Sequence, residues 1–386
     1  MQPRITEPIR ILHVINGLSI GGAEMMLYKL LSRTSRERFE PVVISLMGQG
    51  ALGARIEALG VPVHAMGMKP GMPTPGATWR LIRLVRRLKP DLIQGWMYHG
   101  NLAALLAGTF APGPVPVLWN IRRSLYSLDH DKPLTAIITK LGARLSGLPV
   151  KILYNSKVGA IQHRDFGYRP DKTLVIPNGF DTELFVPSTE ARGSVRLELD
   201  LAENTVLIGL IGSYSPRKDH TNFLRAAALL LKSRPDIHFI LSGRGVAWEN
   251  QALGELVRSL GITERVHLLG ERHDIPRLTA ALDIASSSSA FDEGFPNVVG
   301  EAMSCGVPCV VTDVGDSAWI VEETGLVVPP RNSEALCTAW LELIEMGTAA
   351  RRNLGMRARQ RIKEQFSIEK IVQQYERVYG EQLYGA

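Results

Sequence analysis

The sequence predicts an α/β protein with two doubly wound parallel sheets. Near-continuous apolar runs, such as the one at 9–15, alternate with longer segments in which apolar residues recur at helical spacing. The same alternation begins again near residue 205. The 386 residues, 45% hydrophobic and 21% charged, exceed one ordinary domain and suffice for two cores. Repeated strand–helix units of this kind indicate parallel sheets covered by helices on both faces.

The first half of the chain supplies one sheet. It opens with a strand at 9–15, a glycine-rich turn containing Gly21 and Gly22, and an amphipathic helix over 22–34. The glycines either let a phosphate approach the backbone closely or simply form a tight turn. Further strands are predicted over 41–46, 61–66, 91–96, 115–120 and 151–155. Because ligands of parallel sheets bind beyond the carboxyl ends of strands, 96–101 and 120–123 are candidate site segments.

Charge is distributed unevenly along the chain. Residues 1–190 contain 23 Lys and Arg against 13 Asp and Glu, whereas residues 191–386 contain 21 against 25. The predicted helix over 76–89 contributes Arg80, Arg83, Arg86, Arg87 and Lys89. Such a helix either lies on an anionic membrane or packs its apolar face on the sheet with its arginines in solvent. The chain has no aromatic-interleaved basic motif or zinc-finger spacing, so nucleic acid is not an expected partner.

Cysteine usage and hydropathy indicate a cytoplasmic location. Cys305, Cys309 and Cys337 are few and lack metal-ligand spacing, which favours a reducing compartment. No apolar run reaches the ~18 residues of a spanning helix. The polar N-terminus leads directly into a strand, unlike a signal peptide. We therefore expect a cytoplasmic protein, with peripheral contact at the inner membrane face through the basic first half.

The stretch 290–315 in the second half carries the strongest functional signal. Glu293 and Glu301 stand eight positions apart, separated by a Gly-Phe-Pro turn and an apolar segment. Proline disfavours helix in the residue before it, and Asn297 is a suitable N-cap for a helix over 297–305. The free N–H groups and positive dipole end of that helix suit an anion, above all a phosphate.

This stretch resembles the Glu-x-seven-Glu signature of retaining glycosyltransferases with the GT-B fold, in glycosyltransferase family four ("glycosyl transferases group 1"). The resemblance implies that Glu293 and the adjoining loop amides hold the donor sugar and diphosphate, while Glu301 holds the ribose hydroxyls. The donor-binding set that it implies is Gly21, Gly22, Arg272, Gly294, Phe295, Asn297 and Glu301.

Other positions match the family pattern less uniformly. Lys218 matches the lysine that meets the diphosphate, whereas Ser213 occupies the position of the usual arginine. Arg217 either substitutes for that arginine or is a solvated loop residue. Arg272 resembles the residue that frames the nucleotide base, on which a planar guanidinium stacks. The implied catalytic set is therefore Glu293, Lys218 and Arg217.

The first domain departs from the family at one position. Asn120 stands where many members have a histidine, so any mechanism that needs a general base there is in doubt. His99 either lines the acceptor side of the site or has a capping or packing role. His99 and Asn120 are the predicted acceptor-side residues.

The resemblance implies two Rossmann-like doubly wound domains facing a central cleft. We expect an acceptor domain over 1–190, a linker near 187–193, a donor domain over 191–366, and a helix over 367–386 that crosses back to the first domain. The implied reaction moves a sugar from a nucleotide-sugar donor to a saccharide acceptor, lipid-linked, in cell-surface polysaccharide biosynthesis. It retains the anomeric configuration and needs no metal or other cofactor. Asp129-His130-Asp131 looks like the metal-binding Asp-x-Asp of the other glycosyltransferase fold but lacks its context.

Two further function classes remain open. Ser213 and Asn120 allow a non-catalytic sugar-nucleotide-binding protein, and the fold also serves nucleotide-sugar epimerases. A dinucleotide oxidoreductase is disfavoured because no G-x-G-x-x-G follows the first strand. The nucleotide base, the sugar, the acceptor and the linkage are not encoded in any motif that we recognise.

Overall fold

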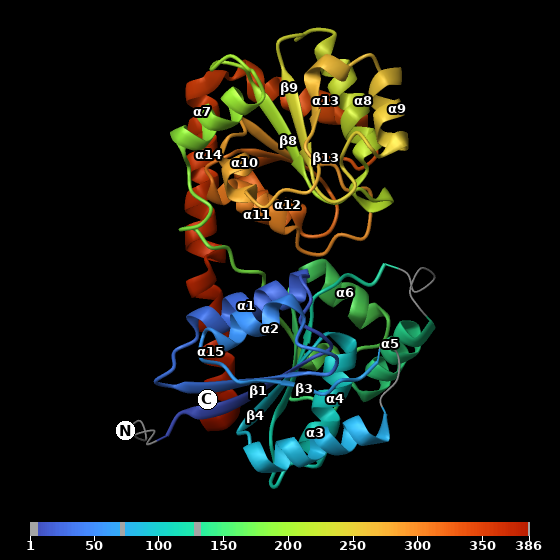
Figure 1. Cartoon of the computed structure of the whole chain (residues 1–386), viewed down its shortest axis with the longest axis vertical. Coiled ribbons are helices and arrows are strands. Elements are labelled where there is room, and N and C mark those ends of the chain that lie inside the picture. The colour runs from blue at the N-terminus through green and yellow to red at the C-terminus, as the bar shows by residue number, and fades with distance from the viewer. Residues whose placement is uncertain (1–6, 70–73, 127–132, 385–386) are drawn as a thin grey trace. The chain divides into compact units, whose positions relative to one another are not determined.

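The computed structural model describes residues 7–69, 74–126 and 133–384. The chain divides into two compact units (Figure 1). Unit 1 comprises Met1–Gly179 with Ile368–Ala386, and unit 2 comprises Phe180–Ser367. The Asp129-His130-Asp131 motif lies outside the described residues. Each unit is an α/β structure with its own sheet.

Unit 1 is built on a parallel sheet, seven-stranded within the described residues, in the order β3-β2-β1-β4-β5-β6-β7. The chain reverses its direction of travel across the sheet between β1 and β4, which makes this pair the topological switch point. The strands are β1 (Ile9–Ile15), β2 (Phe39–Ser45), β3 (Val63–Ala65), β4 (Leu92–Trp96), β5 (Val117–Ile121), β6 (Lys151–Tyr154) and β7 (Thr173–Val175).

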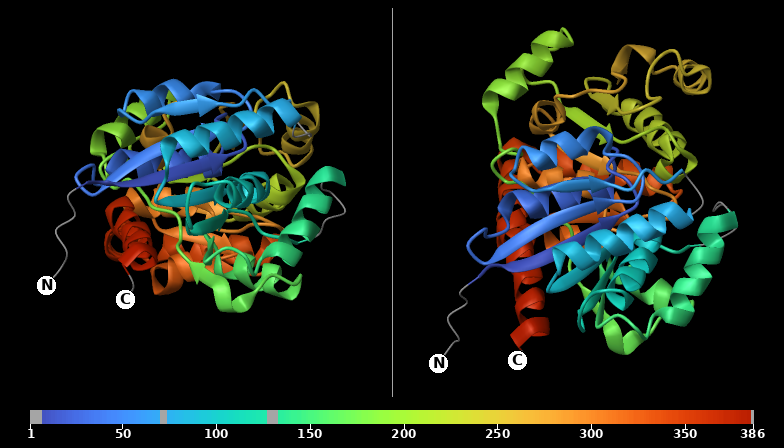
Figure 2. Two further views of the ribbon diagram at one scale, coloured as in Figure 1. Left: turned by 90° about the horizontal axis from the view of Figure 1, so that it is seen from below. Right: turned by 60° about the horizontal axis from the view of Figure 1, so that its bottom comes forward.

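Helices cover both faces of the unit 1 sheet. The core on one face includes residues of α1, α2 and α15, and the core on the other face includes residues of α3 to α6. The helix α15, red in Figure 2, lies against the blue N-terminal segments, so the two ends of the chain share one unit. The helices are α1 (Gly22–Arg33), α2 (Gly50–Glu57), α3 (Pro75–Leu88), α4 (Met97–Thr109), α5 (Pro133–Leu145), α6 (Lys157–Asp165) and α15 (Ile368–Tyr384).

Unit 2 repeats the plan with a parallel sheet, six-stranded in the part of the chain that the structure describes, in the order β10-β9-β8-β11-β12-β13. This is the strand order of a Rossmann domain, with its switch point between β8 and β11. The strands are β8 (Leu207–Ile211), β9 (His238–Ser242), β10 (Val266–Leu268), β11 (Ile284–Ser287), β12 (Cys309–Thr312) and β13 (Gly325–Val328).

The two faces of the unit 2 sheet carry separate cores. Residues of α8, α9 and α13 cover one face, and residues of α7, α10, α11, α12 and α14 cover the other (Figure 1). The helices are α7 (Thr189–Glu198), α8 (His220–Leu231), α9 (Gln251–Ser259), α10 (Ile275–Ala280), α11 (Asn297–Ser304), α12 (Ser317–Val321), α13 (Ser333–Glu345) and α14 (Gly347–Arg361).

The structure places the start of unit 2 earlier than the expected boundary at 190/191. Unit 2 begins at Phe180, and most of the segment expected as a linker forms the start of α7. The Ser188 side chain caps that helix by accepting from the Ala191 amide at 3.0 Å. Arg196 of α7 is 2% exposed and pairs with Asp283 at 2.7 Å. Arg192, inside the segment expected as a linker, also pairs with Asp283 at 2.8 Å, and no local pattern indicates a partner 91 residues further along the chain.

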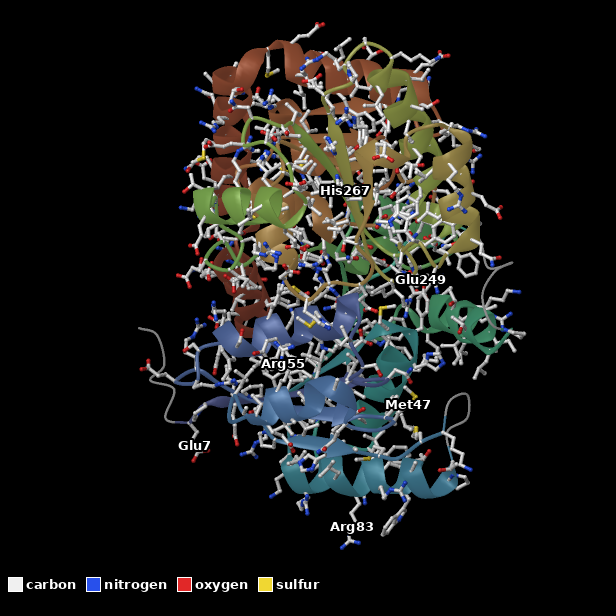
Figure 3. The ribbon with its side chains drawn as sticks, turned by 45° about the horizontal axis from the view of Figure 1, so that its top comes forward. Glu7, Met47, Arg55, Arg83, Glu249 and His267 are labelled. Atoms are coloured by element: carbon white, nitrogen blue, oxygen red, sulfur yellow. The ribbon has the colours of Figure 1, made fainter. Side chains whose placement is uncertain are left out.

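The basic helix α3 packs one face on unit 1 and turns the other to solvent. Leu81, Leu84 and Val85 are buried, whereas Trp79 is 59% exposed. The guanidinium of Arg83 lies over the Trp79 ring at 5.4 Å. Arg83 points away from the body of unit 1, and Met47 lies on the other side of α3 (Figure 3). Among the described residues, no helix is both long and apolar enough to traverse a bilayer.

Candidate functional site

The predicted catalytic residues meet at the switch point of unit 2. Lys218 lies in a short 3-10 turn (Pro216–Lys218) that follows β8, and Glu293 lies in the loop that follows β11. Because β8 and β11 are neighbouring parallel strands, both loops leave the same edge of the sheet. The Lys218 ammonium contacts Glu293 Oε2 at 2.6 Å. Two residues separated by 75 positions thus form one ion pair at the place where Rossmann domains bind ligands.

Burial makes this pair electrostatically strong. The side chains of Lys218 and Glu293 are 12% and 10% exposed. Burial alone raises the pKa of Glu293, but Lys218, Arg217 and the Ser289 hydroxyl together bring that pKa below its ordinary value. Glu293 is therefore a carboxylate at neutral pH, held close to a cation in a region of low dielectric.

The loop that carries Glu293 is tightly constrained. Arg217 donates to the Asp292 carbonyl at 3.3 Å, and Asp292 has a positive φ of 50°. Residues in such sparsely populated conformations concentrate at functional sites. Gly315 has a φ of 61°, and a Cβ there would lie 2.2 Å from the Glu293 carbonyl oxygen. Only glycine at this position lets the backbone pack directly against the loop that carries Glu293.

Two supporting residues were missed by the sequence reasoning. Ser289 donates to Glu293 Oε2 at 3.0 Å, and Gly315 closes the loop as described. The run of serines at 286–289, directly between an apolar strand and Glu293, is a signal that could have identified Ser289. Nothing in the local sequence relates Gly315 to Glu293, because the contact depends on the fold.

The helix α11 follows this loop and differs in detail from the prediction. It begins at Asn297, but Pro296 is the N-cap and no side chain caps the helix. The predicted capping role of Asn297 is therefore wrong, because the proline leaves the chain in extended conformation one residue earlier. Glu301 is half-buried about one turn further along α11. A half-exposed carboxylate thus follows a helix start that no side chain caps, and such a start suits an anion.

Phe295 is part of the core. Its side chain is 5% exposed and lies among the rings of Phe180, Trp319 and Phe366. Its predicted place in the donor site is therefore limited to its backbone. The ring anchors the loop, which keeps Gly294 and Glu293 at the sheet edge. The Gly294 carbonyl accepts from the Asp316 amide at 2.8 Å.

Carboxylates of two elements hold the guanidinium of Arg272. It donates twice to Asp274, at 2.8 and 2.9 Å, and once to Glu198 of α7 at 2.8 Å. These hydrogen bonds raise the pKa of Arg272 and lower that of Asp274. The side chain therefore ties α7 to the loop before α10. Hydrogen bonds in the plane of a guanidinium do not occupy its faces, so the base-stacking role that the resemblance implied stays a prediction.

Unit 1 holds the remaining predicted residues. Gly21 is the N-cap of α1 in extended conformation, and a Cβ at Gly22 would meet no heavy atom within 4 Å. The backbone at Gly22 is thus open to approach. His99 lies near the start of α4, directly after β4, and burial lowers its pKa so that it is neutral at pH 7.

Asn120 is fully buried in β5, unlike a residue that meets an acceptor. Its amide nitrogen donates to the Tyr375 hydroxyl of α15 at 2.9 Å. Its backbone N–H donates to Asn101 Oδ1 at 3.1 Å, and Arg122 also donates to the Tyr375 hydroxyl at 2.9 Å. The predicted acceptor-side residue therefore joins the terminal helix to the sheet.

Within the described residues, no group of three or more His, Cys, Asp or Glu side chains is arranged to hold a metal ion. The charged centre of the site is the pair of Lys218 and Glu293.

Comparison with known proteins agrees with this geometry. Residues 20–184 match the model of "Glycosyltransferase Family 4", and residues 205–346 match the model of "Glycosyl transferases group 1". The second match contains Lys218, Glu293 and Glu301. The chain belongs to glycosyltransferase family four. The predicted family is thereby confirmed.

Two similar proteins are glycosyltransferases by their names. The chain is 27% identical to the UDP-Gal:alpha-D-GlcNAc-diphosphoundecaprenol alpha-1,3-galactosyltransferase of Escherichia coli, over 52% of this chain and 62% of that protein. It is 34% identical to the lipopolysaccharide core mannosyltransferase LpsB of Rhizobium meliloti, over 47% and 53%. The aligned part thus spans about half to three fifths of these family members.

A solved structure covers the whole fold. The crystal structure of Anabaena Alr3699/HepE in complex with UDP superposes with a TM-score of 0.83 and 25% identity, covering 97% of this chain and all of that one. The predicted fold class, GT-B with two Rossmann-like parallel-sheet domains, is confirmed by this similarity and by the two observed sheets.

Proposed function

We propose that this protein is a retaining glycosyltransferase that moves a sugar from a nucleotide-sugar donor to a lipid-linked saccharide acceptor in cell-surface polysaccharide biosynthesis. The observation that carries the proposal is the buried ion pair of Lys218 and Glu293 at the switch point of unit 2. Its surroundings, a helix start without a side-chain cap and a half-buried Glu301, match what a nucleoside diphosphate sugar presents: phosphates, a sugar and ribose hydroxyls.

The chemistry follows from where charge develops. When the bond between the anomeric carbon and the β-phosphate breaks, negative charge grows on the phosphate and positive charge on the sugar. Lys218, with Arg217 on the same turn, stabilises the phosphate charge, and the amides at the start of α11 add a dipole of the right sign. Glu293 binds the sugar hydroxyls as a carboxylate and stabilises the developing cation. These groups supply the required charges themselves, and no metal enters the proposal.

The names of similar proteins support the proposed classes of acceptor and donor. The Escherichia coli relative acts, by its name, on a saccharide linked to diphosphoundecaprenol, with UDP-Gal as donor. Solved structures of Alr3699/HepE contain UDP and UDP-glucose. We therefore propose a UDP-sugar as the first donor to test. The predicted domain roles follow: unit 2 binds the donor, and unit 1 binds the acceptor.

A thermal-stability screen tests the donor site. Wild type and Glu301→Ala are measured with UDP-, GDP-, ADP- and TDP-sugars, and Glu255→Ala on the exposed face of α9 serves as the matched control. A ligand at 100 times its Kd adds about 2.7 kcal/mol of stability. We expect a shift with one base, retained in Glu255→Ala and weakened in Glu301→Ala. No shift with any nucleotide sugar, in folded protein, would contradict the proposal.

Product analysis separates the competing functions. With donor and a lipid-linked saccharide, we expect a new glycosidic bond whose anomeric configuration, determined by NMR, equals that of the donor. Turnover with EDTA present is expected to be unchanged. Conversion of the donor alone into another nucleotide sugar would instead identify an epimerase. Donor binding without any turnover would identify a non-catalytic binding protein.

We also propose that the exposed face of α3 contacts an anionic membrane surface from the cytoplasm. Trp79 and the arginines of α3 are exposed, which suits the interface between water and anionic lipid headgroups. Co-sedimentation with phosphatidylglycerol vesicles at low salt is expected for wild type and weakened in Arg83→Glu/Arg87→Glu. Wild type that stays in the supernatant would refute the membrane contact and leave the donor site untouched.

A further inference from the structure

Unit 1 contains an open apolar cavity of about 400 Å³ between α4 and α5. A site for a small organic ligand occupies roughly 300–1,000 Å³ and is lined mainly by apolar side chains. The polar lining residues within the described part of the chain are Asn16, Lys69, Thr78 and His99, and the others are aliphatic or methionine. The volume and the apolar lining of this cavity are therefore those of a ligand site.

The two helices line the cavity with matched stripes. On α4 the lining residues are His99, Leu102, Ala103 and Leu106, and on α5 they are Leu134, Ile137, Ile138 and Leu141. Both sets follow the i, i+3, i+4, i+7 spacing of one helix face. Both stripes line the same open space. The trough runs about 10 Å along α4, at a rise of about 1.5 Å per residue.

The polar end of the trough lies at the ligand-binding edge of the sheet. Asn16 directly follows β1, and His99 is close behind the end of β4, the two strands of the switch point in unit 1. Lys69 also lines the cavity and is exposed, so the lining includes a cation. At the other helix, Ile137 and Leu141 are 60% and 41% exposed, which leaves an apolar rim in contact with water.

We propose that this trough binds the hydrocarbon chain of the lipid-linked acceptor, next to its anionic head group. A chain with a phosphate or diphosphate at one end has the same polarity as the trough: apolar along α4 and α5, and negative where Lys69 provides a positive charge. The exposed rim at Ile137 and Leu141 gives the rest of the chain an apolar exit toward a bilayer. This inference rests on the proposed function, since it names the part of the acceptor that unit 1 recognises.

Farnesyl diphosphate is the probe, and its dissociation constant is measured by calorimetry. The nucleotide identified by the donor screen is present at saturation, so that its diphosphate site is occupied. We expect farnesyl diphosphate to bind at least tenfold more tightly than inorganic diphosphate. Ala103→Trp fills the trough and is expected to weaken binding at least tenfold. Ala349→Trp, on an exposed position of α14, is the matched control and is expected to bind as wild type does.

Leu141→Gln provides a second variant at the exposed rim, where the substitution leaves the core untouched. It is expected to weaken binding of farnesyl diphosphate while leaving the affinity for inorganic diphosphate unchanged. Equal affinities for the two probes, or unchanged binding in both trough variants, would overturn the proposal. So would a wild-type dimer that Leu141→Gln converts to a monomer, because a second copy would then be the occupant.

The outcome is separable from that of the proposed function. If no nucleotide sugar binds but farnesyl diphosphate binding responds to the trough variants, the glycosyltransferase proposal fails and the lipid trough stands. If a donor is turned over with a soluble saccharide and the trough variants change nothing, the proposed transfer stands and the trough assignment fails.

Discussion

Replacing Lys218 by methionine should destabilise unit 2 through the carboxylate that it leaves behind. Glu293 is 10% exposed in its side chain and contacts the ammonium at 2.6 Å. Removing one partner of a buried ion pair costs about 3–5 kcal/mol. Ser289 still donates to the carboxylate, and both side chains keep some contact with water, so we expect about 3 kcal/mol. Unit 2 spans residues 180–367, and for a unit of that length a loss of about 3 kcal/mol corresponds to a fall in Tm of roughly 6–12 °C.

A double-mutant cycle measures this coupling. Glu293→Gln removes the charge, so Lys218→Met/Glu293→Gln leaves no buried ion and should cost less than the two single substitutions together by about 2 kcal/mol. Chemical denaturation and calorimetry give the free energies. Lys232→Met, at an exposed lysine after α8, is the control and should change stability by less than about 0.5 kcal/mol. A loss below about 1 kcal/mol in Lys218→Met, or additive effects, would refute the reasoning.

Three further predictions concern pH, packing and hydrogen bonding. The folded protein holds the pKa of Glu293 below its ordinary value of 4.5, so the stability that the carboxylate contributes is complete above pH 4.5 and is lost as pH falls through the folded pKa. Glu293→Gln should therefore flatten the profile of unfolding free energy against pH in acid. A variant profile parallel to that of wild type would contradict this. Gly300→Ala places a Cβ 2.1 Å from the Phe180 ring and should cost about 1–3 kcal/mol of unfolding free energy by denaturant titration. Gly193→Ala, where α7 has open space, should instead stabilise the protein by up to about 1 kcal/mol. Equal effects of the two substitutions would refute this packing argument. Tyr375→Phe removes the hydroxyl that accepts from the buried Asn120 amide and from Arg122, and it should cost about 1–3 kcal/mol by thermal unfolding; an unchanged Tm would contradict this.

Much of the fold follows from local patterns in the sequence. The apolar run at 9–15 is β1, and the predicted helix over 297–305 is α11 with one residue fewer. Such elements are predictable because apolar periodicity, proline and glycine act within a few residues. The resemblance implied that Glu293 and Lys218 belong to one site, but their ion pair was not predicted, since no local rule joins positions 75 residues apart.

The contacts that the sequence did not indicate join distant parts of the chain. Arg272 pairs with Glu198 of α7, 74 residues earlier, and no local pattern predicted that pair. Asn120 was expected to face an acceptor, but Tyr375 engages it from 255 residues later. A sequence shows that a side chain is polar and near a strand end, but it does not show which distant segment supplies the hydrogen-bond partner of that side chain.

The return of α15 to unit 1 determines the order in which the protein is completed on the ribosome. The 188 residues of unit 2 are translated between Gly179 and Ile368. At about 5–20 residues per second, that interval lasts roughly 9–38 s. During this time the first unit to be synthesised lacks Ile371, Tyr375 and Tyr379, which cover one face of its core. The nascent chain therefore exposes the apolar surface of its oldest part until its last helix emerges, and a premature stop near the C-terminus damages the N-terminal unit.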